Sequence, residues 1–465
     1  MAAVSSLRRT MSRQTTRAFL LTSNPFIKLS SSRLKEAGVA WNLSSALEGR
    51  GRALFSTTLH QQRQRQRQSL DDLPNRRTFR LKDAPARELL CLEWSQPPRN
   101  LLLIKKEFSE QTTEALKEFS NHVMTTYPDV NILVEPQVSA EIGDALPRHH
   151  CSPHGSPLSR QQYQDKVDLV VTFGGDGTIL HAASIFATAP EVPPILSFSM
   201  GTLGFLSEWK FAEYKRAFRE VYMSGAASER HTVIQSSSTT QQDSIADWTG
   251  WSSIRGKSMG PARGARVLVR QRLKVGLFDA GGKRLGKGDL LQDLHAMNEV
   301  ILHRGQDPHL AIVDVYVGGR FLTEAVADGI IISTPTGSTA YSLSSGGSII
   351  HPLVPSLLLT PICPRSLSFR PLVLPATTPI TLKLSEKNRG RELEFSIDGK
   401  RHTDGIGVGT EVQVSCEEIR DSSQGFVGGI PCIMRRTTAG TEGDDGWVGG
   451  LNGLLKFNHP FGEDG

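Results

Sequence analysis

The sequence predicts two folded regions of different class: an N-terminal α/β domain and a C-terminal, mostly-β domain. Up to about residue 235, short apolar runs alternate with segments of helical spacing, as expected where parallel strands alternate with covering helices. Beyond residue 265 the pattern changes to the alternation of half-buried strands. A chain of 465 residues is long enough for two such domains and further segments.

In the first half, apolar runs of strand length predict strands at residues 100–104, 130–134, 167–173 and 194–198. Helical spacing predicts helices at residues 110–125 and 213–223. The run 167–173 is mostly apolar, which is typical of a central strand covered on both sides. Residues 137–163 contain Pro147, Pro153 and Pro157, and we expect them to form a flexible loop.

That expected loop contains a cluster of candidate metal ligands, namely His149, His150, Cys151 and His154. Their spacing matches no standard zinc pattern, and the neighbouring prolines indicate an irregular chain. We therefore favour a loop over a metal centre. The five cysteines are scattered and form no C-x-x-C pair, which indicates a reducing compartment and no structural zinc.

In the second half, alternation predicts strands at residues 266–275, 296–303, 311–317, 320–325, 329–333, 380–384 and 394–397. Residues 236–264 are rich in Ser, Thr, Gln and Gly and predict a flexible insertion. These patterns give domain boundaries of 95–235 for the α/β domain and 265–430 for the mostly-β domain. We expect residues 431–465 to form a tail that docks on the core through Trp447, Leu451, Leu454, Leu455 and Phe457.

Positive charge is concentrated in a leader, residues 1–68, which has 12 Lys and Arg against 2 acidic residues. Its apolar residues lie among arginines at a spacing that allows a basic amphipathic helix, which is typical of a mitochondrial transit peptide. We expect import into the mitochondrial matrix; a disordered cytosolic tail is the alternative. The rest of the chain is slightly acidic, which disfavours nucleic-acid binding. No apolar run approaches the roughly 18 residues of a membrane-spanning helix.

A glycine-rich turn, Gly174-Gly175-Asp176-Gly177-Thr178, lies between an expected strand and an expected helix. Open α/β sheets place ligands beyond the carboxyl ends of their strands. Glycines there let backbone N–H groups approach phosphate oxygens, and the following helix adds its positive end. Asp176 would repel a phosphate unless it bound Mg²⁺ or accepted a proton from an attacking hydroxyl. The alternative is a tight turn in which Asp176 caps the helix.

A second stretch, residues 328–347, combines hydroxyl side chains and glycines with one aromatic residue, Tyr341. Many hydroxyl and N–H groups with few charges suit a ligand that carries sugars and amides, and Tyr341 offers a face for stacking. The alternative is a Ser/Thr turn cluster. Asn298 and Glu299 fall within an expected strand and could hold a ribose diol, although alone they are indistinguishable from a polar surface pair.

The order of these motifs resembles that of the NAD kinase family. The glycine turn is followed by Gly201-Thr202-Leu203-Gly204-Phe205-Leu206, by Asn298-Glu299, by the stretch 328–347, by residues 359–371 (LTPICPRSLSFRP) and by Asp398-Gly399-Lys400. Together the motifs cover roughly residues 100–415. The leader and the tail at 447–461 add a similarity to the mitochondrial NADH kinase branch of fungi.

This resemblance implies an N-terminal α/β domain, a C-terminal β-sandwich-like domain and a site between them, usually within a homo-oligomer. It implies that ATP phosphorylates the 2′-hydroxyl of the adenosine ribose of NAD(H), giving NADP(H). Mg²⁺ would arrive with ATP, and the protein would have no metal site of its own. The sequence does not decide between NADH and NAD⁺, although the branch similarity favours NADH.

Residue roles follow from the same resemblance. Asp176 would be the catalytic base or the group that orients the hydroxyl. Phosphates would be cradled by Gly174, Gly175, Gly177 and Thr178. The dinucleotide would contact Phe205 on its adenine side, Asn298 and Glu299 at a ribose, then Asp328, Thr336, Thr339, Ala340, Tyr341 and Ser344, with Asp398 at the rim of the pocket.

Two positions depart from the family pattern. Ser199 stands where Asn or Ala is common, and Arg365, which could change nucleotide contacts, stands where His is usual. Related glycine-Asp turns occur in diacylglycerol and sphingosine kinases and in phosphofructokinases, so another phosphoryl acceptor is the nearest alternative function. A catalytically silent dinucleotide sensor is the second. The stretch 328–347 argues against a lipid acceptor, and the intact Asp176 argues against a sensor.

Overall fold

The computed structural model describes residues 67–68, 70, 73–83, 89–143, 146, 149–150, 159–201, 204–226, 264–285, 293–422, 425–435, 447, 451 and 455. These residues belong to one compact unit, His60–Gly465. The expected insertion at 236–264, nearly all of the leader and most of the tail lie outside them. Of the tail, Trp447 is described in contact with the β-rich part of the chain, its ring 4.7 Å from that of His351.

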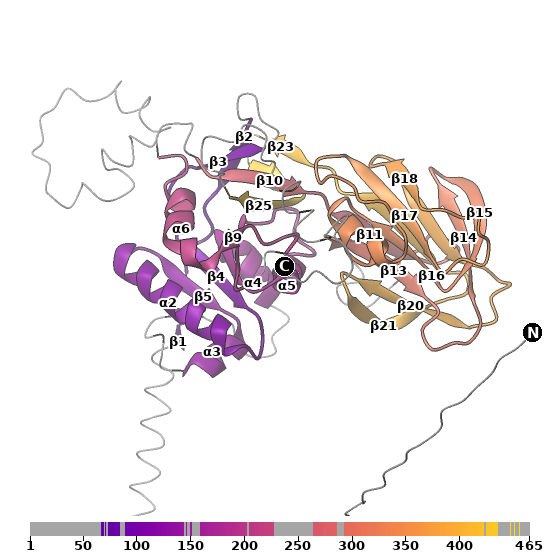
Figure 1. Cartoon of the computed structure of the whole chain (residues 1–465), viewed down its shortest axis with the longest axis horizontal. Helices are drawn as coiled ribbons and strands as arrows, with labels where there is room; N and C mark the ends of the chain where they lie inside the picture. Colours follow the sequence, from indigo (N-terminus) through magenta and orange to yellow (C-terminus); the bar gives the residue numbers. More distant parts are fainter. Residues whose placement is uncertain are drawn as a thin grey trace, which may run out of the picture. The chain divides into compact units, whose positions relative to one another are not determined.

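An eleven-stranded sheet forms the α/β part (Figure 1). Its parallel centre consists of β5 (Asn131–Val134), β4 (Asn100–Lys105), β7 (Leu169–Phe173) and β8 (Ile195–Ser199), in that order across the sheet. All four were expected within two residues of their observed bounds. They are central and covered on both faces, which explains their short, continuous apolar runs. Beyond them lie β1 (Arg67–Gln68), β6 (His149–His150) and β9 (Trp209–Lys210).

The other side of this sheet is built from segments far apart in the sequence. After β8 come β25 (Ile430–Met434), β10 (Arg266–Arg270), β3 (Leu90–Trp94) and β2 (Phe79–Lys82). The sequence placed residues 266–275 in the mostly-β domain as one strand and residues 431 onward in the tail. The chain instead leaves this sheet after Arg270 and returns to it at Ile430, so the boundary between the two regions lies inside the expected strand.

Helices cover both faces of the sheet (Figure 1). Alternate residues of β4 belong to two different cores, Leu101 and Leu103 to one and Leu102 and Ile104 to the other. The first core packs against α2 (Glu110–Thr126), α3 (Pro136–Ile142) and α6 (Tyr214–Tyr222). The second packs against α4 (Ser159–Lys166) and α5 (Asp176–Ile185).

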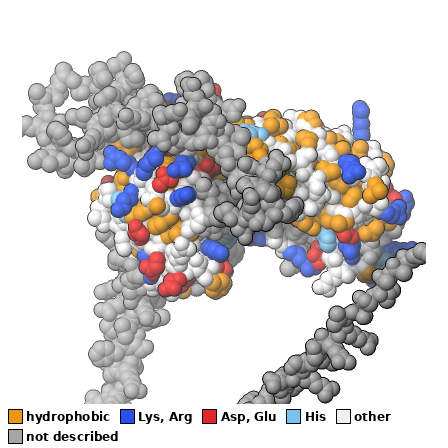
Figure 2. Space-filling model, in the orientation of Figure 1, with side chains coloured by type: hydrophobic (Ala, Val, Ile, Leu, Met, Phe, Trp, Pro, Cys, Tyr) orange, Lys and Arg blue, Asp and Glu red, His pale blue; other side chains and the backbone are white. Residues whose placement is uncertain are grey.

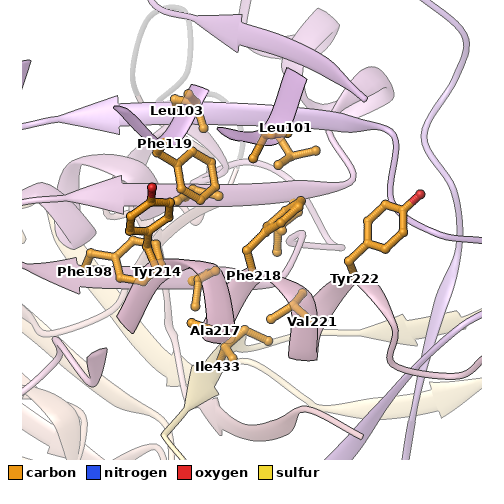
Figure 3. Close-up of a cluster of buried hydrophobic side chains, with 14 of the residues drawn as sticks. Leu101, Leu103, Phe119, Phe198, Tyr214, Ala217, Phe218, Val221, Tyr222 and Ile433 are labelled. Carbon is orange, nitrogen blue, oxygen red and sulfur yellow. The ribbon is translucent and has the colours of Figure 1, made fainter. Parts of the chain in front are cut away.

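Aromatic side chains fill the first core. Figure 3 shows the rings of Phe119, Tyr214 and Phe218 together between the helices and the sheet. The ring of Phe119 lies 5.5 Å from that of Phe218 and 6.0 Å from that of Tyr214, both edge to face. Because buried rings in this arrangement contribute both apolar area and favourable edge contacts, they fix α2 and α6 against the sheet.

The loop expected at residues 137–163 is incorrect, because this segment contains α3, β6 and α4. The two imidazole nitrogens of His149 are engaged by Ser139 Oγ at 2.8 Å and by the carbonyl of Leu146 at 3.1 Å. Cys151 and His154 lie outside the described residues. Within the described ranges, no three His, Cys, Asp or Glu side chains come together as metal ligands would. In the same ranges, no helix has the length and apolar character needed to span a membrane.

Two six-stranded antiparallel sheets form the β-rich part. One contains β12 (Leu294–Ala296), β11 (Leu273–Phe278), β22 (Glu411–Cys416), β19 (Ile380–Leu384), β14 (Ala311–Val317) and β15 (Arg320–Ala327). The other contains β18 (Leu372–Pro375), β17 (Ser356–Ile362), β16 (Gly329–Ser333), β13 (Glu299–His303), β20 (Glu392–Ile397) and β21 (Lys400–Gly407). Alternate residues of most of these strands enter one shared core, which makes the pair a sandwich. A smaller hairpin joins β23 (Arg420–Ser422) to β24 (Gly425–Val427).

The strands β15 and β18 stand at the ends of the two sheets and carry exposed apolar side chains. Figure 2 shows hydrophobic side chains on the surface of this part of the molecule. We call these exposed residues the edge patch; they are Phe321 and Leu322 on β15, Val373 on β18, and Val354 and Leu367 in the connections before and after β17. Exposed large apolar side chains are typical of a surface that contacts another molecule.

A buried ion pair joins the sandwich to the α/β part. The Arg272 guanidinium donates to both carboxylate oxygens of Glu417 at 2.6 and 2.7 Å. It also donates to the carbonyls of Phe186 and Ala189, just beyond the end of α5, at 3.1 and 2.9 Å. The backbone N–H of His295 donates to the intervening carbonyl of Ala187 at 3.0 Å. We call this set of contacts the joint; it holds the far end of the helix that begins with Asp176.

Candidate functional site

The glycine turn lies where β7 ends and α5 begins, as the sequence predicted. A Cβ at Gly174 would lie 3.1 Å from Thr178 Cβ and 3.2 Å from Lys106 Cβ, so this position has no room for a larger residue. A Cβ at Gly175 or at Gly177 would meet no heavy atom within 4 Å. The backbone of these two glycines therefore faces open space, which a ligand could enter closely.

Asp176 is the first residue of α5, and its carboxylate does not cap that helix. Instead it accepts hydrogen bonds from the backbone N–H groups of Phe205 at 3.0 Å and Leu206 at 3.1 Å. A Cβ at Gly204 would lie 2.8 Å from Asp176 Cγ, so the loop packs directly on the carboxyl group. The capping alternative is therefore wrong, and the carboxylate is fixed in a partly exposed position at the ligand-binding edge of the sheet.

A second group of candidate residues surrounds the start of β13. The Asp398 carboxylate accepts N–H groups from Met297 at 2.7 Å, Asn298 at 2.7 Å and Glu299 at 3.0 Å. Three backbone donors on one carboxylate fix this turn and orient the two side chains that follow it. Burial raises the pKa of Asp398, and the three N–H donors oppose that shift.

Glu299 and Asn298 carry buried polar atoms with no partner in the described part of the chain, namely Oε2 of Glu299 and Oδ1 of Asn298. Glu299 is only 6% exposed. Burial, followed by the nearby charge of Asp398, raises the pKa of Glu299 to about 8, and the Tyr341 N–H opposes this shift. Buried oxygens without partners are costly, so both are available to the hydroxyl groups of a ligand.

We expect the Glu299 carboxyl to make the stability of the protein depend on pH. Below pH 4.5 it is protonated in both the folded and the unfolded chain. Between pH 4.5 and about 8 only the folded chain keeps the proton, so this group lowers the free energy of unfolding by about 1.4 kcal/mol per pH unit. As pH rises through this window, the unfolding temperature of wild type should therefore fall relative to that of Glu299→Gln. A constant difference from pH 5 to 8 would contradict the raised pKa.

The stretch 328–347 contains β16, then η7 (Thr336–Thr339) and α9 (Tyr341–Ser344). Several of its hydroxyl groups hold the turn itself: Thr334 Oγ1 donates to Met297 O at 2.6 Å, and Ser338 Oγ donates to Pro335 O at 2.6 Å. The turn-cluster alternative thus accounts for part of the pattern. The side chains left exposed include Tyr341, at 41%, and Ser344. This turn lies against Asn298, because a Cβ at Gly337 would be 2.6 Å from the carbonyl carbon of Asn298.

Arg270, which the sequence analysis missed, connects the two groups. Its side chain is almost fully buried, and its guanidinium donates to Phe205 O at 3.5 Å and to Thr336 Oγ1 at 3.4 Å. It thereby links the loop on Asp176 to the turn beside Asn298. The sequence feature that could have revealed it is an arginine beside Val and Leu in an apolar strand. If only one face of that strand is assumed to be buried, such an arginine is interpreted as a surface charge.

Asp328 is not brought to these residues. It precedes β16, where Arg304 Nε donates to its carboxylate at 2.6 Å. Ser333, at the other end of β16, is the residue that pairs with Glu299. Ser333 lies four positions after Gly329 along an extended strand, which corresponds to about 13 Å. Within one chain, Asp328 therefore lies a strand length from the group around Glu299.

Comparison with known proteins gives matches over both regions. Residues 101–226 match the family model of the ATP-NAD kinase N-terminal domain, and residues 297–418 match that of the C-terminal domain. A mitochondrial NADH kinase of Schizosaccharomyces pombe is 39% identical over 371 residues, covering 80% of this chain and 78% of the relative. One from Saccharomyces cerevisiae is 37% identical over 405 residues, covering 81% and 85%.

The fold also matches a solved structure. The crystal structure of yeast NADH kinase complexed with NADH superposes with a TM-score of 0.65 at 35% sequence identity. The match covers 86% of this chain and 99% of the yeast chain. The order of an α/β region and a β-rich region is thus common to both proteins.

Proposed function

The chain belongs to the ATP-NAD kinase family, and we propose that it transfers the γ-phosphoryl group of ATP to the 2′-hydroxyl of the adenosine ribose of NADH or NAD⁺. Its relatives are named as NADH kinases, and the yeast structure that it resembles contains NADH. The observation that carries the proposal is the Asp176 carboxylate, held by two backbone N–H groups beside an open glycine turn.

In this proposal the 2′-hydroxyl oxygen forms a bond to the γ-phosphorus of ATP, and Asp176 accepts the proton that this hydroxyl loses. The bond from that phosphorus to the β–γ bridging oxygen breaks, leaving ADP. The exposed N–H groups of Gly175 and Gly177 contact phosphate oxygens. The unpartnered Asn298 oxygen accepts a ribose hydroxyl, the Glu299 carboxyl, which is protonated below about pH 8, forms hydrogen bonds with the ribose hydroxyls, and the exposed face of Tyr341 stacks on the dinucleotide.

Mg²⁺ enters as part of the ATP substrate. Its charge neutralises phosphate oxygens during transfer, which a site containing Asp176 needs. Omission of Mg²⁺ from the assay should therefore abolish turnover. We further propose location in the mitochondrial matrix, supported by the names of the two relatives and by the composition of the leader.

The test is to express residues 56–465 and to measure NADP(H) formation from Mg-ATP with NADH and NAD⁺ in parallel. We expect product from both dinucleotides and a higher kcat/KM for NADH. Tight dinucleotide binding without product in folded protein would instead support the sensor function. Phosphorylation of a lipid or a sugar phosphate with no NADP(H) formed would support the other acceptor class.

We also propose that the protein is a homo-oligomer joined through the edge patch. Asp328 donates its N–H to Ile362 O at 2.9 Å, and Arg365 donates its N–H to Val326 O at 2.8 Å, so Asp328 lies beside the segment that carries Leu367. Within one chain, Asp328 lies a strand length from Glu299 and therefore from the dinucleotide held there. If Asp328 contacts a dinucleotide, that dinucleotide is the one bound by a second copy of the chain.

Replacing Leu367 by Asp is expected to break this oligomer, because it places a charge where an apolar side chain, 83% exposed in a single copy, would be buried. Light scattering after gel filtration should show a smaller particle for the variant, and KM for NADH should rise. Val408→Asp, at an exposed position outside the edge patch, is the matched control and should keep the wild-type mass. A wild type that is already monomeric would contradict the proposal.

A further inference from the structure

The turn between β4 and α2, residues 106–108, lies beside the glycine turn and has no role in the mechanism above. The backbone of Lys106 is fixed on both sides: its N–H donates to Phe173 O at 2.9 Å, and its carbonyl accepts Thr112 Oγ1 at 3.0 Å. Its Cβ lies 3.2 Å from where a Cβ on Gly174 would be. The Lys106 side chain therefore starts from a fixed point next to the first glycine of the turn.

The ammonium of Lys106 is exposed, and no described carboxylate pairs with it. Its neighbour Lys105 differs in both respects, since that side chain is buried and its ammonium lies 2.7 Å from Glu141. The glycine turn itself supplies only N–H groups and the negative charge of Asp176. A nucleoside triphosphate bound there would need a cation close to its phosphates, and Lys106 is placed to supply one.

Phe108, two residues further on, has two unfavourable properties at once. Its side chain is 99% exposed, and its backbone is left-handed with φ +52°. A left-handed backbone at a bulky residue costs free energy relative to glycine, and an exposed ring gains no burial in return. Residues kept in such a conformation cluster at ligand sites.

The start of α2 is tied to the rest of the site. Gln111 Nε2 donates to the carbonyl of Met200 at 3.1 Å. Met200 lies four residues before Gly204, where the loop that holds Asp176 begins to pack on its carboxylate. The turn 106–108 therefore has a fixed position beside the glycine turn, and the helix that follows it is tied to Met200, just before the loop that packs on Asp176.

We propose that residues 106–108 form the subsite for the phosphoryl donor, a purine nucleoside triphosphate. Lys106 pairs with its phosphates, and the ring of Phe108 stacks on its base. Binding covers the exposed ring, which gives the strained backbone a function. This inference rests on the proposed function. It adds the location of the subsite for the phosphoryl donor, which is separate from the subsite for the dinucleotide.

The test compares KM for the two substrates in Lys106→Met and Phe108→Ala. Loss of a charged phosphate contact is expected to raise KM for Mg-ATP about tenfold or more in Lys106→Met, with KM for NADH within about twofold of wild type. Phe108→Ala should raise KM for Mg-ATP in the same selective way. Lys117→Met is the control, because Lys117 is a lysine on α2 paired with Glu114, and it should change neither constant.

Phe108→Gly separates binding from folding. Glycine relieves the left-handed backbone, so this variant should unfold at a temperature equal to or higher than that of wild type while its KM for Mg-ATP rises. Phe108→Trp should keep a low KM, and the new indole fluorescence should change on addition of Mg-ATP. A Phe108→Gly variant with wild-type KM would overturn the stacking role.

Calorimetric titration with a non-hydrolysable ATP analogue and Mg²⁺ tests the subsite independently of turnover. If wild type makes no NADP(H) yet binds the analogue more tightly than Lys106→Met, the proposed function fails and the subsite stands. If wild type phosphorylates NADH and Lys106→Met matches it in KM for Mg-ATP, the subsite is refuted and the function stands. A selective rise in KM for NADH would also overturn the assignment.

Discussion

Asp176→Asn is expected to lower kcat by a factor of about 10² to 10⁴, the usual contribution of a positioned acid-base group. The amide cannot accept the proton of the 2′-hydroxyl. In wild type the carboxylate accepts hydrogen bonds from the N–H groups of Phe205 and Leu206. The amide turns its NH₂ group toward one of these two donors, so one hydrogen bond is lost. The loop should loosen slightly, while the residues around Glu299, which we propose to bind the dinucleotide, stay in place.

The measurement is kcat with Mg-ATP and NADH, together with the Kd of NADH from its fluorescence in the absence of ATP. We expect Kd to change by less than about fivefold, since only one hydrogen bond of the loop is lost. Asp129→Asn, an exposed carboxylate in a turn, serves as the control. Near-normal turnover in Asp176→Asn would contradict the proposal that Asp176 is the catalytic base.

Arg272→Met is expected to cause the largest loss of stability, about 3–5 kcal/mol, because the largely buried Glu417 carboxylate loses its guanidinium partner and keeps only neutral donors such as the Gly429 N–H. It also removes the guanidinium hydrogen bonds to the carbonyls of Ala189 and Phe186, of which the second keeps the Ala189 N–H. The joint between the sandwich and the end of α5 should weaken, and kcat should fall with it, since α5 carries Asp176 at its other end.

Denaturant unfolding of wild type and variant measures this loss. Arg420→Met is the matched control, because Arg420 pairs with Glu418 at the surface, and exposed pairs contribute at most about 1 kcal/mol. Arg272→Lys should lose less than Arg272→Met, since it keeps the charge but not the forked geometry. An Arg272→Met variant as stable as the control would show that the joint is not needed for folding.

Local patterns predicted the centre of the fold well. The glycine turn was found because a buried strand, a turn and a helix follow one another within residues 167–185, so the sequence neighbours are also the spatial neighbours. The sandwich strands β13, β14, β15, β16, β19 and β20 were found for the same reason, because their period depends only on which face is buried. The strands β17, β18, β21 and β22 were not predicted.

Features that depend on distant pairing were missed. Arg270 looked like a charge on a half-exposed strand because the sequence does not reveal that β25, some 160 residues later, pairs with β10 and places it inside the large sheet. Similarly, the hydroxyls of residues 334–342 suggested a ligand, yet several bond to nearby carbonyls. A cluster of hydroxyl residues in the sequence indicates that these groups need hydrogen-bond partners. It does not show whether the partner is a ligand or a backbone carbonyl of the chain itself.

The position of β25 determines when the α/β part can be completed. This strand fills the gap between β8 and β10, yet it is made near the end of the chain. While the protein is being synthesised, or threaded through a narrow channel, the facing edges of these two strands remain unpaired until Ile430–Met434 emerges, although β8 pairs with β7 and β10 with β3. Until then the nascent chain exposes two strand edges that can aggregate. A truncation before Ile430 should leave an insoluble protein, even though every proposed catalytic residue is present.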